Sequence, residues 1–182
     1  MLKSDDSVLL VMDVQGKLAG LVHEHAQMQA NVQRLIQSAE LLKIPVLWTE
    51  QAPDKIGPTI EPIARLLFPL VKPIAKRSFS AYPCPEFKDA LKKSGRSQIL
   101  MTGIETHVCV YQTARDLRYY GYEVQVVADA VSSRTQANTN IALERMRAEG
   151  ITITSAEMAL CEWLGGADHP QFKEIMANIK RL

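Results

Sequence analysis

The chain has 182 residues, of which 47% are hydrophobic and 23% charged, and its formal net charge is +1. This length and composition are typical of a globular domain with a full hydrophobic core. The near-balance of 21 basic and 20 acidic residues gives no electrostatic footprint for nucleic acid or for an anionic membrane, so neither is expected as a partner.

Targeting and membrane signals are weak along the chain. Met1–Asp6 contains no extended apolar segment, and the longest apolar runs, such as Ser7–Met12, are too short to span a bilayer. The three cysteines, Cys84, Cys109 and Cys161, are odd in number and widely spaced, which argues against a disulfide framework. We therefore expect a cytoplasmic protein.

One pattern recurs in chain order: a helix-favouring segment ends at a Gly or Pro, and a short apolar run follows. Such runs are typical of strands buried on both faces. Their alternation with helices predicts a three-layer α/β/α sandwich with a mainly parallel sheet. With no repeat and no domain boundary visible, residues 1–182 are expected to form a single domain. The predicted strands include Val8–Met12, Val46–Thr49, Gln98–Met101, Val124–Val127 and Ile151–Thr154.

Two of the segments between these strands can be interpreted further. Val32, Leu35, Ile36 and Ala39 recur at three- and four-residue spacing, which predicts an amphipathic helix after the first strand. The proline-rich segment Pro53–Pro73 is expected to be an elaborated connection with at most short helices.

Three reactive residues fall at the carboxyl ends of predicted strands. Asp13 closes the first strand, Lys76 follows the short candidate strand Lys72–Ala75, and Cys109 comes soon after the strand that ends near Met101. Because ligands bind beyond the carboxyl ends of the strands in an open parallel sheet, the three side chains are expected to share one cleft.

Together these residues predict nucleophilic catalysis by Cys109. A thiol at a helix start is expected to favour the thiolate, which is the nucleophile. Asp13 would take the thiol proton and return it to a leaving amine, while Lys76 would stabilise the thiolate. Backbone N–H groups around Val108 and Cys109 would form an oxyanion hole.

Taken singly, each of these residues also has a structural interpretation. A lone Cys is most often a small buried residue, a lone Asp often caps a turn, and Lys76 beside Arg77 is by default a surface charge. His107 is expected to make a structural hydrogen bond. Cys161 is expected in the core and Cys84 in an exposed loop.

Three segments resemble the motifs of the isochorismatase-like cysteine hydrolases, and the resemblance extends over nearly the whole chain. It implies a six-stranded sheet of Rossmann type, an Asp13–Lys76–Cys109 triad, and a non-proline cis peptide near Ile104–Glu105. The segments are Val11–Gln15, Lys76–Tyr82 and Gly103–Val110.

Two departures from the family narrow the expected chemistry. Nicotinamidase-type members carry an Asp-x-His motif for a metal after the second strand, where this chain has Thr49–Pro53. True isochorismatases lack the nucleophilic Cys. No metal and no organic cofactor are therefore expected, and the segment resembles the isochorismatase-domain-containing subgroup.

The resulting hypothesis is a hydrolase of a small amide or related C–N bond, in a homo-oligomer, acting through a thioester-type intermediate. A redox-active thiol protein and a non-catalytic binding or scaffold protein remain open as alternatives. The residues expected to line the substrate pocket are Gln15, Glu50, Gln51, Phe79, Tyr82 and Glu105.

Overall fold

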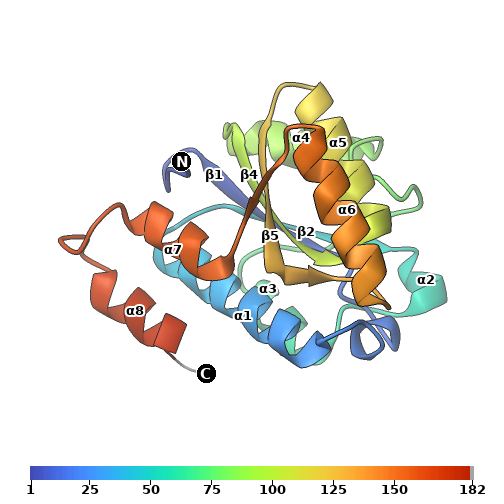
Figure 1. Cartoon of the computed structure of the whole chain (residues 1–182), viewed down its shortest axis with the longest axis horizontal. Coiled ribbons are helices and arrows are strands. Elements are labelled where there is room, and N and C mark those ends of the chain that lie inside the picture. Colours follow the sequence, from blue (N-terminus) through green and yellow to red (C-terminus); the bar gives the residue numbers. More distant parts are fainter. Residues whose placement is uncertain (181–182) are drawn as a thin grey trace.

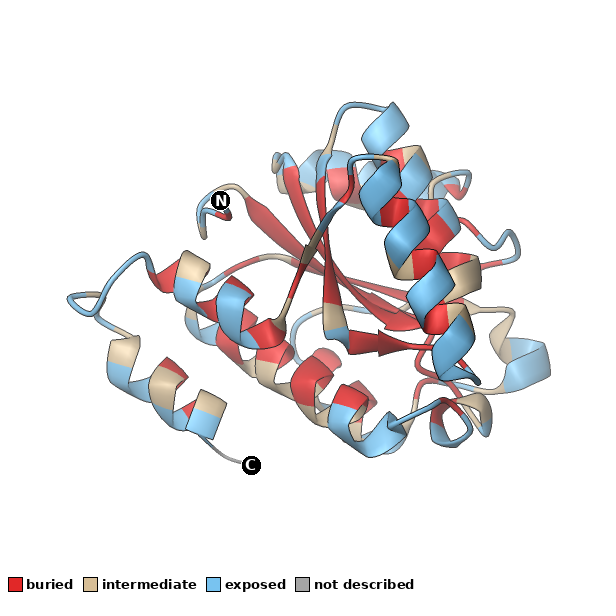
Figure 2. Ribbon diagram, viewed as in Figure 1, coloured by how far each residue is buried: buried red, intermediate tan, exposed pale blue. Residues whose placement is uncertain are grey.

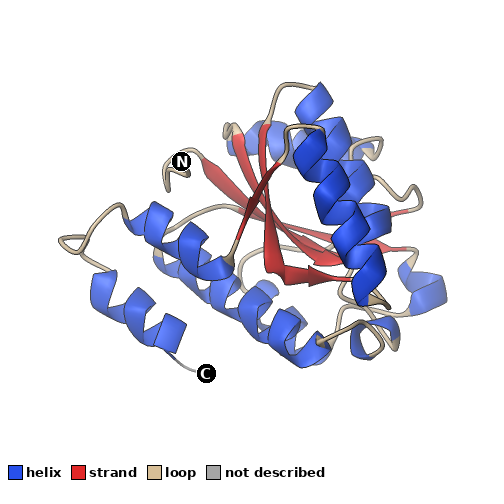
Figure 3. Cartoon of the chain, viewed as in Figure 1, coloured by secondary structure: helices blue, strands red, loops and turns tan. Residues whose placement is uncertain are grey.

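The computed structural model describes residues 1–180, and its strands form one parallel sheet between two layers of helices (Figure 3). The strands are β1 (Ser7–Met12), β2 (Val46–Gln51), β3 (Ile74–Lys76), β4 (Gln98–Ile104), β5 (Glu123–Ser132) and β6 (Thr152–Thr154). The helices are α1 (His25–Leu41), α2 (Pro53–Ile56), α3 (Glu61–Leu67), α4 (Pro85–Ser94), α5 (Tyr111–Tyr119), α6 (Gln136–Ala148), α7 (Ala156–Leu164) and α8 (Phe172–Lys180). A 3-10 turn, η1 (Leu18–Gly20), and a π-helical turn, η2 (Thr106–Val110), complete the elements.

The strand order is β3-β2-β1-β4-β5-β6, and every neighbouring pair is parallel. The order reverses between β1 and β4, because the chain first builds outward from β1 to β3 and then returns to the other side of β1. This reversal is the position at which open α/β sheets bind ligands. The predicted α/β/α sandwich is thus confirmed, and the switch point lies where Asp13 leaves β1.

The helices cover both faces of the sheet (Figure 1). α1, α3, α7 and α8 pack on one face, and α4, α5 and α6 pack on the other. Because side chains alternate along a strand, β1 supplies Leu9 and Val11 to the first core and Val8, Leu10 and Met12 to the second. Burial on both faces is why the strands have near-continuous apolar sequences (Figure 2).

Two irregularities shape the carboxyl edge of the sheet. Gly103 in β4 has φ +114°, and a Cβ at this position would overlap the carbonyl oxygen of Met12 on β1. In β5, the residues Val127–Ala130 lie opposite the single residue Thr102 of β4, so the register of this pair shifts there. Glycine is therefore required at the β1–β4 contact, and the pairing of β4 with β5 is irregular beside it.

Three of the sequence predictions outside the site can be compared with the fold. The proline-rich segment forms only the short helices α2 and α3, as predicted. The predictions for two cysteines are wrong: Cys161 is exposed, because it lies beside the buried stripe of α7, and Cys84 is buried beneath the start of α4. Within residues 1–180, no helix is long and apolar enough to cross a membrane.

Candidate active site

The structure brings Asp13, Lys76 and Cys109 together beyond the carboxyl ends of β1, β3 and β4. Lys76 Nζ lies 2.8 Å from Asp13 Oδ2. The Cys109 thiol is close enough to both side chains for their charges to act on its pKa. The exposed fractions are 3% for Asp13, 3% for Lys76 and 7% for Cys109. A carboxylate, an ammonium and a thiol therefore meet in a site that is nearly closed to solvent.

Asp13 is held by contacts to β2. It leaves β1 with φ 54°, and its N–H donates to the Thr49 carbonyl at 3.1 Å. The Thr49 hydroxyl donates to Asp13 Oδ1 at 2.8 Å. Asp13 Oδ2 contacts Lys76 and accepts no further hydrogen bond from the residues described. One carboxylate oxygen is thus fixed by the scaffold, and the other is turned toward the ammonium and the thiol.

Lys76 is the last residue of β3 and is surrounded by oxygen atoms. Besides Asp13, its ammonium donates to Gln51 Oε1 at 2.7 Å, to the Phe79 carbonyl at 2.9 Å and to the Ser78 carbonyl at 3.2 Å. A set composed only of acceptors stabilises the charged ammonium, which has three donors and no acceptor. Lys76 is therefore a fixed cation in the site and not the surface charge of the structural interpretation.

Cys109 lies in η2, which continues directly into α5. Burial raises the pKa of the Cys109 thiol to about 12; the charge of Asp13 adds to this effect and the charge of Lys76 opposes it. Burial thus works against the thiolate that a helix start was expected to favour, and it favours the neutral thiol as the resting form.

The backbone before Cys109 is folded tightly onto Glu105. The peptide bond between Ile104 and Glu105 is cis. The Glu105 carbonyl accepts from Val108 N–H at 3.1 Å and from Val110 N–H at 3.3 Å. The N–H of Val108, predicted as an oxyanion donor, is therefore already occupied in this arrangement.

Several residues predicted to line the substrate pocket also make contacts that support the scaffold. The Gln15 side chain is fully buried and bonds the backbone of Gln51, and Gln51 in turn contacts Lys76. The Glu50 carboxylate accepts from Thr59 N–H at 2.7 Å. Glu105 Oε1 accepts from the backbone N–H and from Nε of Arg134. These roles arise from contacts between distant segments, which sequence spacing does not show.

The two aromatic candidates differ from each other. Phe79 is 54% exposed and follows directly after the Lys76 loop, so its ring remains available to a ligand near the site. Tyr82 is engaged elsewhere, because its ring stacks on Tyr120 with centroids 4.1 Å apart.

Sequence reasoning missed two residues that hold the site. Thr49 bonds Asp13, and it could have been found because it lies opposite Met12, the residue before Asp13, in the pairing of β1 with β2. The Ser133 hydroxyl oxygen lies 2.9 Å from His107 Nδ1, and the Ser133 carbonyl accepts from His23 N–H. His107 thus has the structural contact that was expected.

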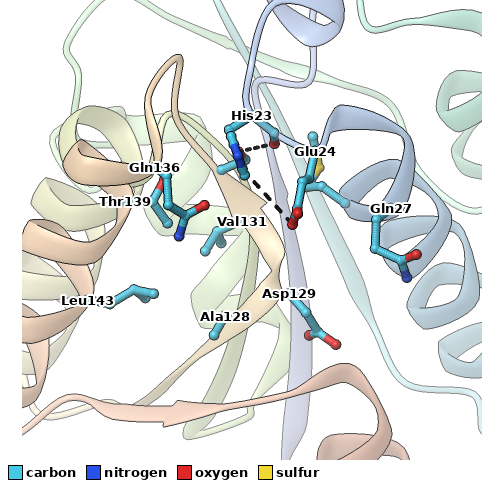
Figure 4. Close-up of a pocket in the computed structure, with 11 residues that line it drawn as sticks. His23, Glu24, Gln27, Ala128, Asp129, Val131, Gln136, Thr139 and Leu143 are labelled. Carbon is cyan, nitrogen blue, oxygen red and sulfur yellow. Dashed lines mark hydrogen bonds and ion pairs between the residues drawn. The ribbon is translucent and has the colours of Figure 1, made fainter.

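No group of three or more His, Cys, Asp or Glu side chains within residues 1–180 is arranged to hold a metal ion. His23 instead lines a hollow of about 280 Å³ between the start of α1, the end of β5 and the start of α6 (Figure 4). Asp13, Lys76 and Cys109 do not line this hollow.

Comparison with known proteins identifies the family. The family model for the Isochorismatase domain matches residues 7–158. The chain is 38% identical to mouse (Mus musculus) isochorismatase domain-containing protein 2A, over 97% of this chain and 84% of the relative. It is 41% identical to the secreted isochorismatase effector Isc1 of Phytophthora sojae, over 96% of this chain and 84% of the relative.

Solved structures agree with this assignment. The structure described as MAR1 ribonuclease from Caenorhabditis elegans has a TM-score of 0.89 and 37% identity, covering 98% of this chain and 91% of that one. The YcaC gene product of Escherichia coli is described as an octameric hydrolase of unknown specificity. It has a TM-score of 0.86 and 25% identity, covering 98% of this chain and 95% of that one. The resemblance inferred from the motifs is confirmed: the chain belongs to the isochorismatase-like hydrolase family.

Proposed function

We propose that the protein is a cysteine hydrolase that cleaves a small amide or a related C–N bond. The observation that carries this proposal is the buried Asp13–Lys76 ion pair of 2.8 Å, with the Cys109 thiol in reach of both charges. A nucleophile, a base and a fixed cation in one enclosed site are the components that covalent acyl transfer needs.

The raised pKa of Cys109 requires that proton transfer accompany attack. Asp13 accepts the thiol proton as Sγ bonds to the substrate carbonyl carbon. The C–N bond then breaks, the same proton passes from Asp13 to the leaving nitrogen, and an acyl thioester remains on Cys109. Water, deprotonated by Asp13, attacks the thioester, and the proton returns to the thiol as the acid is released.

Lys76 and the backbone complete this mechanism. Lys76 offsets the negative charge of the Asp13 carboxylate before it accepts the proton and the negative charge that develops on sulfur as the proton leaves, without giving up a proton itself. The N–H of Cys109 is our proposed oxyanion donor, and Val108 could join it only after releasing its bond to Glu105.

A small substrate is favoured because the three reactive groups are at most 7% exposed. A polymer could not reach Cys109 without opening the surrounding structure. Phe79, exposed beside the Lys76 loop, is the proposed apolar wall of the entrance. Since one similar structure is described as a ribonuclease, RNA belongs in the substrate test.

The remaining expectations are proposals of the same kind. Residues 1–182 form a single domain that works without metal or organic cofactor, and chelation by EDTA should leave turnover unchanged. A cytoplasmic location is supported by the free cysteines. A homo-oligomer is supported by the octameric YcaC structure and by the exposed Phe68 and Leu70, at 64% and 37%, which a second copy could cover.

The decisive experiment is a hydrolysis screen over small amides, with RNA oligonucleotides included and Cys109→Ala as control. Turnover of an amide with a mass-detected acyl adduct on Cys109 is the expected result. Rapid oxidation of Cys109 by peroxide without any hydrolysis would favour the redox alternative. No turnover and no adduct would favour a binding or scaffold protein.

A further inference from the structure

We infer that Gln51 is a positioning residue that orients the Lys76 ammonium between Asp13 and Cys109. This inference rests on the proposed function and deepens it. It gives Gln51 a role beyond the lining of the substrate pocket that the sequence suggested.

The first argument is that the amide of Gln51 can adopt only one orientation. Its Nε2 donates to the Arg77 carbonyl at 2.8 Å, and its Oε1 accepts from Lys76 at 2.7 Å. A flipped amide would place its two donors toward the ammonium and its acceptor toward a carbonyl. Gln51 is therefore fixed as an acceptor for Lys76.

The second argument is that the backbone of Gln51 is itself clamped. Its N–H donates to Gln15 Oε1 at 2.7 Å, and its carbonyl accepts from Gln15 Nε2 at 3.1 Å. The same Nε2 donates to the Gly57 carbonyl at 2.6 Å. Gln15 thus extends the contact between β1 and β2 beyond the strands and fixes the point from which Gln51 reaches Lys76.

The third argument concerns the limited number of donors on Lys76. An ammonium has three N–H groups, and here four oxygen atoms compete for them before any thiolate forms. Gln51 offers the only uncharged side-chain acceptor in this set. Its strength as an acceptor therefore controls how much of the cation remains available to sulfur.

This role predicts opposite effects for two substitutions at one position. Gln51→Glu adds a second carboxylate beside Lys76, so the thiolate should become less favourable and Cys109 should be alkylated more slowly. Gln51→Met removes an acceptor without adding charge, so Lys76 should turn toward sulfur and alkylation should become faster. A change of one pKa unit corresponds to a tenfold change in rate below the pKa.

The test measures iodoacetamide labelling of Cys109 against pH, by peptide mapping of the full-length protein, with amide turnover measured in parallel. Gln29→Glu is the matched control, because Gln29 also donates to a backbone carbonyl, that of Ala19, but lies on the opposite face of the sheet. About tenfold slower labelling in Gln51→Glu, faster labelling in Gln51→Met and no change in Gln29→Glu support the inference.

Two outcomes distinguish failure of the positioning role of Gln51 from failure of the proposed hydrolase function. If Cys109 in the parent protein labels and forms an acyl adduct, but both Gln51 variants change in the same direction or not at all, the positioning role is wrong and the hydrolase stands. If the parent protein forms no adduct with any amide, the hydrolase proposal fails. The labelling profiles would then still decide whether Gln51 controls the cation. Circular dichroism confirms that each variant is folded.

Discussion

Two regions at the carboxyl edge of the sheet differ sharply. Around β1, β3 and β4, charged and nucleophilic side chains are packed so closely that the thiol is only 7% exposed. Beside β5, the hollow lined by His23, Glu24 and Gln136 offers about 280 Å³ (Figure 4), and its charged side chains are open to solvent. The difference shows that this hollow and the reactive side chains lie in different places in this fold.

The physical cause is desolvation. A buried carboxylate and ammonium interact strongly because little water screens them, and the same lack of water raises the pKa of the thiol beside them. In the open hollow, His23 and Glu24 lie 4.0 Å apart and are both exposed, so their interaction is weak. The following predictions test this contrast, beginning with the largest expected effect.

Substitution of the proposed base should have the largest effect on catalysis. Asp13→Asn retains the shape of the side chain but removes its ability to accept the thiol proton. We expect turnover to fall about 10²–10⁴-fold, measured on whichever amide the screen identifies. A folded Asp13→Asn protein with near parental turnover would show that the triad mechanism is wrong and make His107 the next candidate base.

Removal of the buried cation should affect stability as well as turnover. Lys76→Met leaves the Asp13 carboxylate buried and unpaired, which typically costs about 3–5 kcal/mol of unfolding free energy. The neighbouring pair Arg77–Asp54 is the matched control, since its 2.9 Å length is similar but its side chains are 70% and 50% exposed. Arg77→Met should cost no more than about 1 kcal/mol. Equal losses of unfolding free energy in Lys76→Met and Arg77→Met, measured by urea unfolding, would contradict the contrast between the buried and the exposed region.

The raised pKa of Cys109 predicts a specific pH profile. Labelling by iodoacetamide should rise about tenfold per pH unit and show no plateau below about pH 11, because the thiol pKa lies near 12. The measurement uses a Cys161→Ser background, since Cys161 is exposed and would react as well. A plateau near pH 7 would mean that Lys76 and the helix start outweigh burial after all.

The same pKa shift predicts a loss of stability at high pH. The folded-state pKa is raised from the ordinary 9.0 to about 12, so the stabilisation is fully present below pH 9 and is lost as the pH rises toward 12. The slope is about 1.4 kcal/mol per pH unit from this group alone. Cys109→Ser should remove this pH dependence. The unfolding free energies of the parent and of Cys109→Ser, measured against pH, should therefore run parallel below pH 9 and diverge above it.

The smallest effect is expected in the hollow. Gln136→Leu places an apolar group at its rim, and turnover should stay within a factor of about two of the parent, because Gln136 is exposed and none of the three reactive residues lines the hollow; stability should change by no more than about 0.5 kcal/mol. A large change in kcat would show that the hollow is coupled to the nucleophile through Ser133 and His107.

The sequence predicted well those features that depend on repeated local patterns. Buried parallel strands have continuous apolar sequences, so β1, β2 and β4 could be recognised, and the rule for their carboxyl ends brought Asp13, Lys76 and Cys109 to one place. The predictions failed where a shift of one residue along a helix decides whether a side chain is buried or exposed. Cys161 follows Leu160 by one position, and this 100° step along α7 moves it from core to solvent.

Side-chain roles at the site could not be predicted for a different reason. Gln15, Glu50 and Gln51 lie at or just after the carboxyl ends of β1 and β2, as substrate-binding residues often do, and their partners come from segments that meet only in the folded protein. The protonation state of Cys109 depends on how deeply the folded chain buries the thiol, which no spacing in the sequence encodes.

The close approach at Gly103 constrains how this protein can change in evolution. Because even a methyl group at that position would strike the Met12 carbonyl of β1, no single substitution there can be accommodated without separating the two central strands. Asp13 follows Met12 directly, so such a separation would also move the proposed base. In a library of random variants, every folded protein should therefore retain glycine at position 103. Gly95 has open space around it and should tolerate residues such as Asn that accept positive φ.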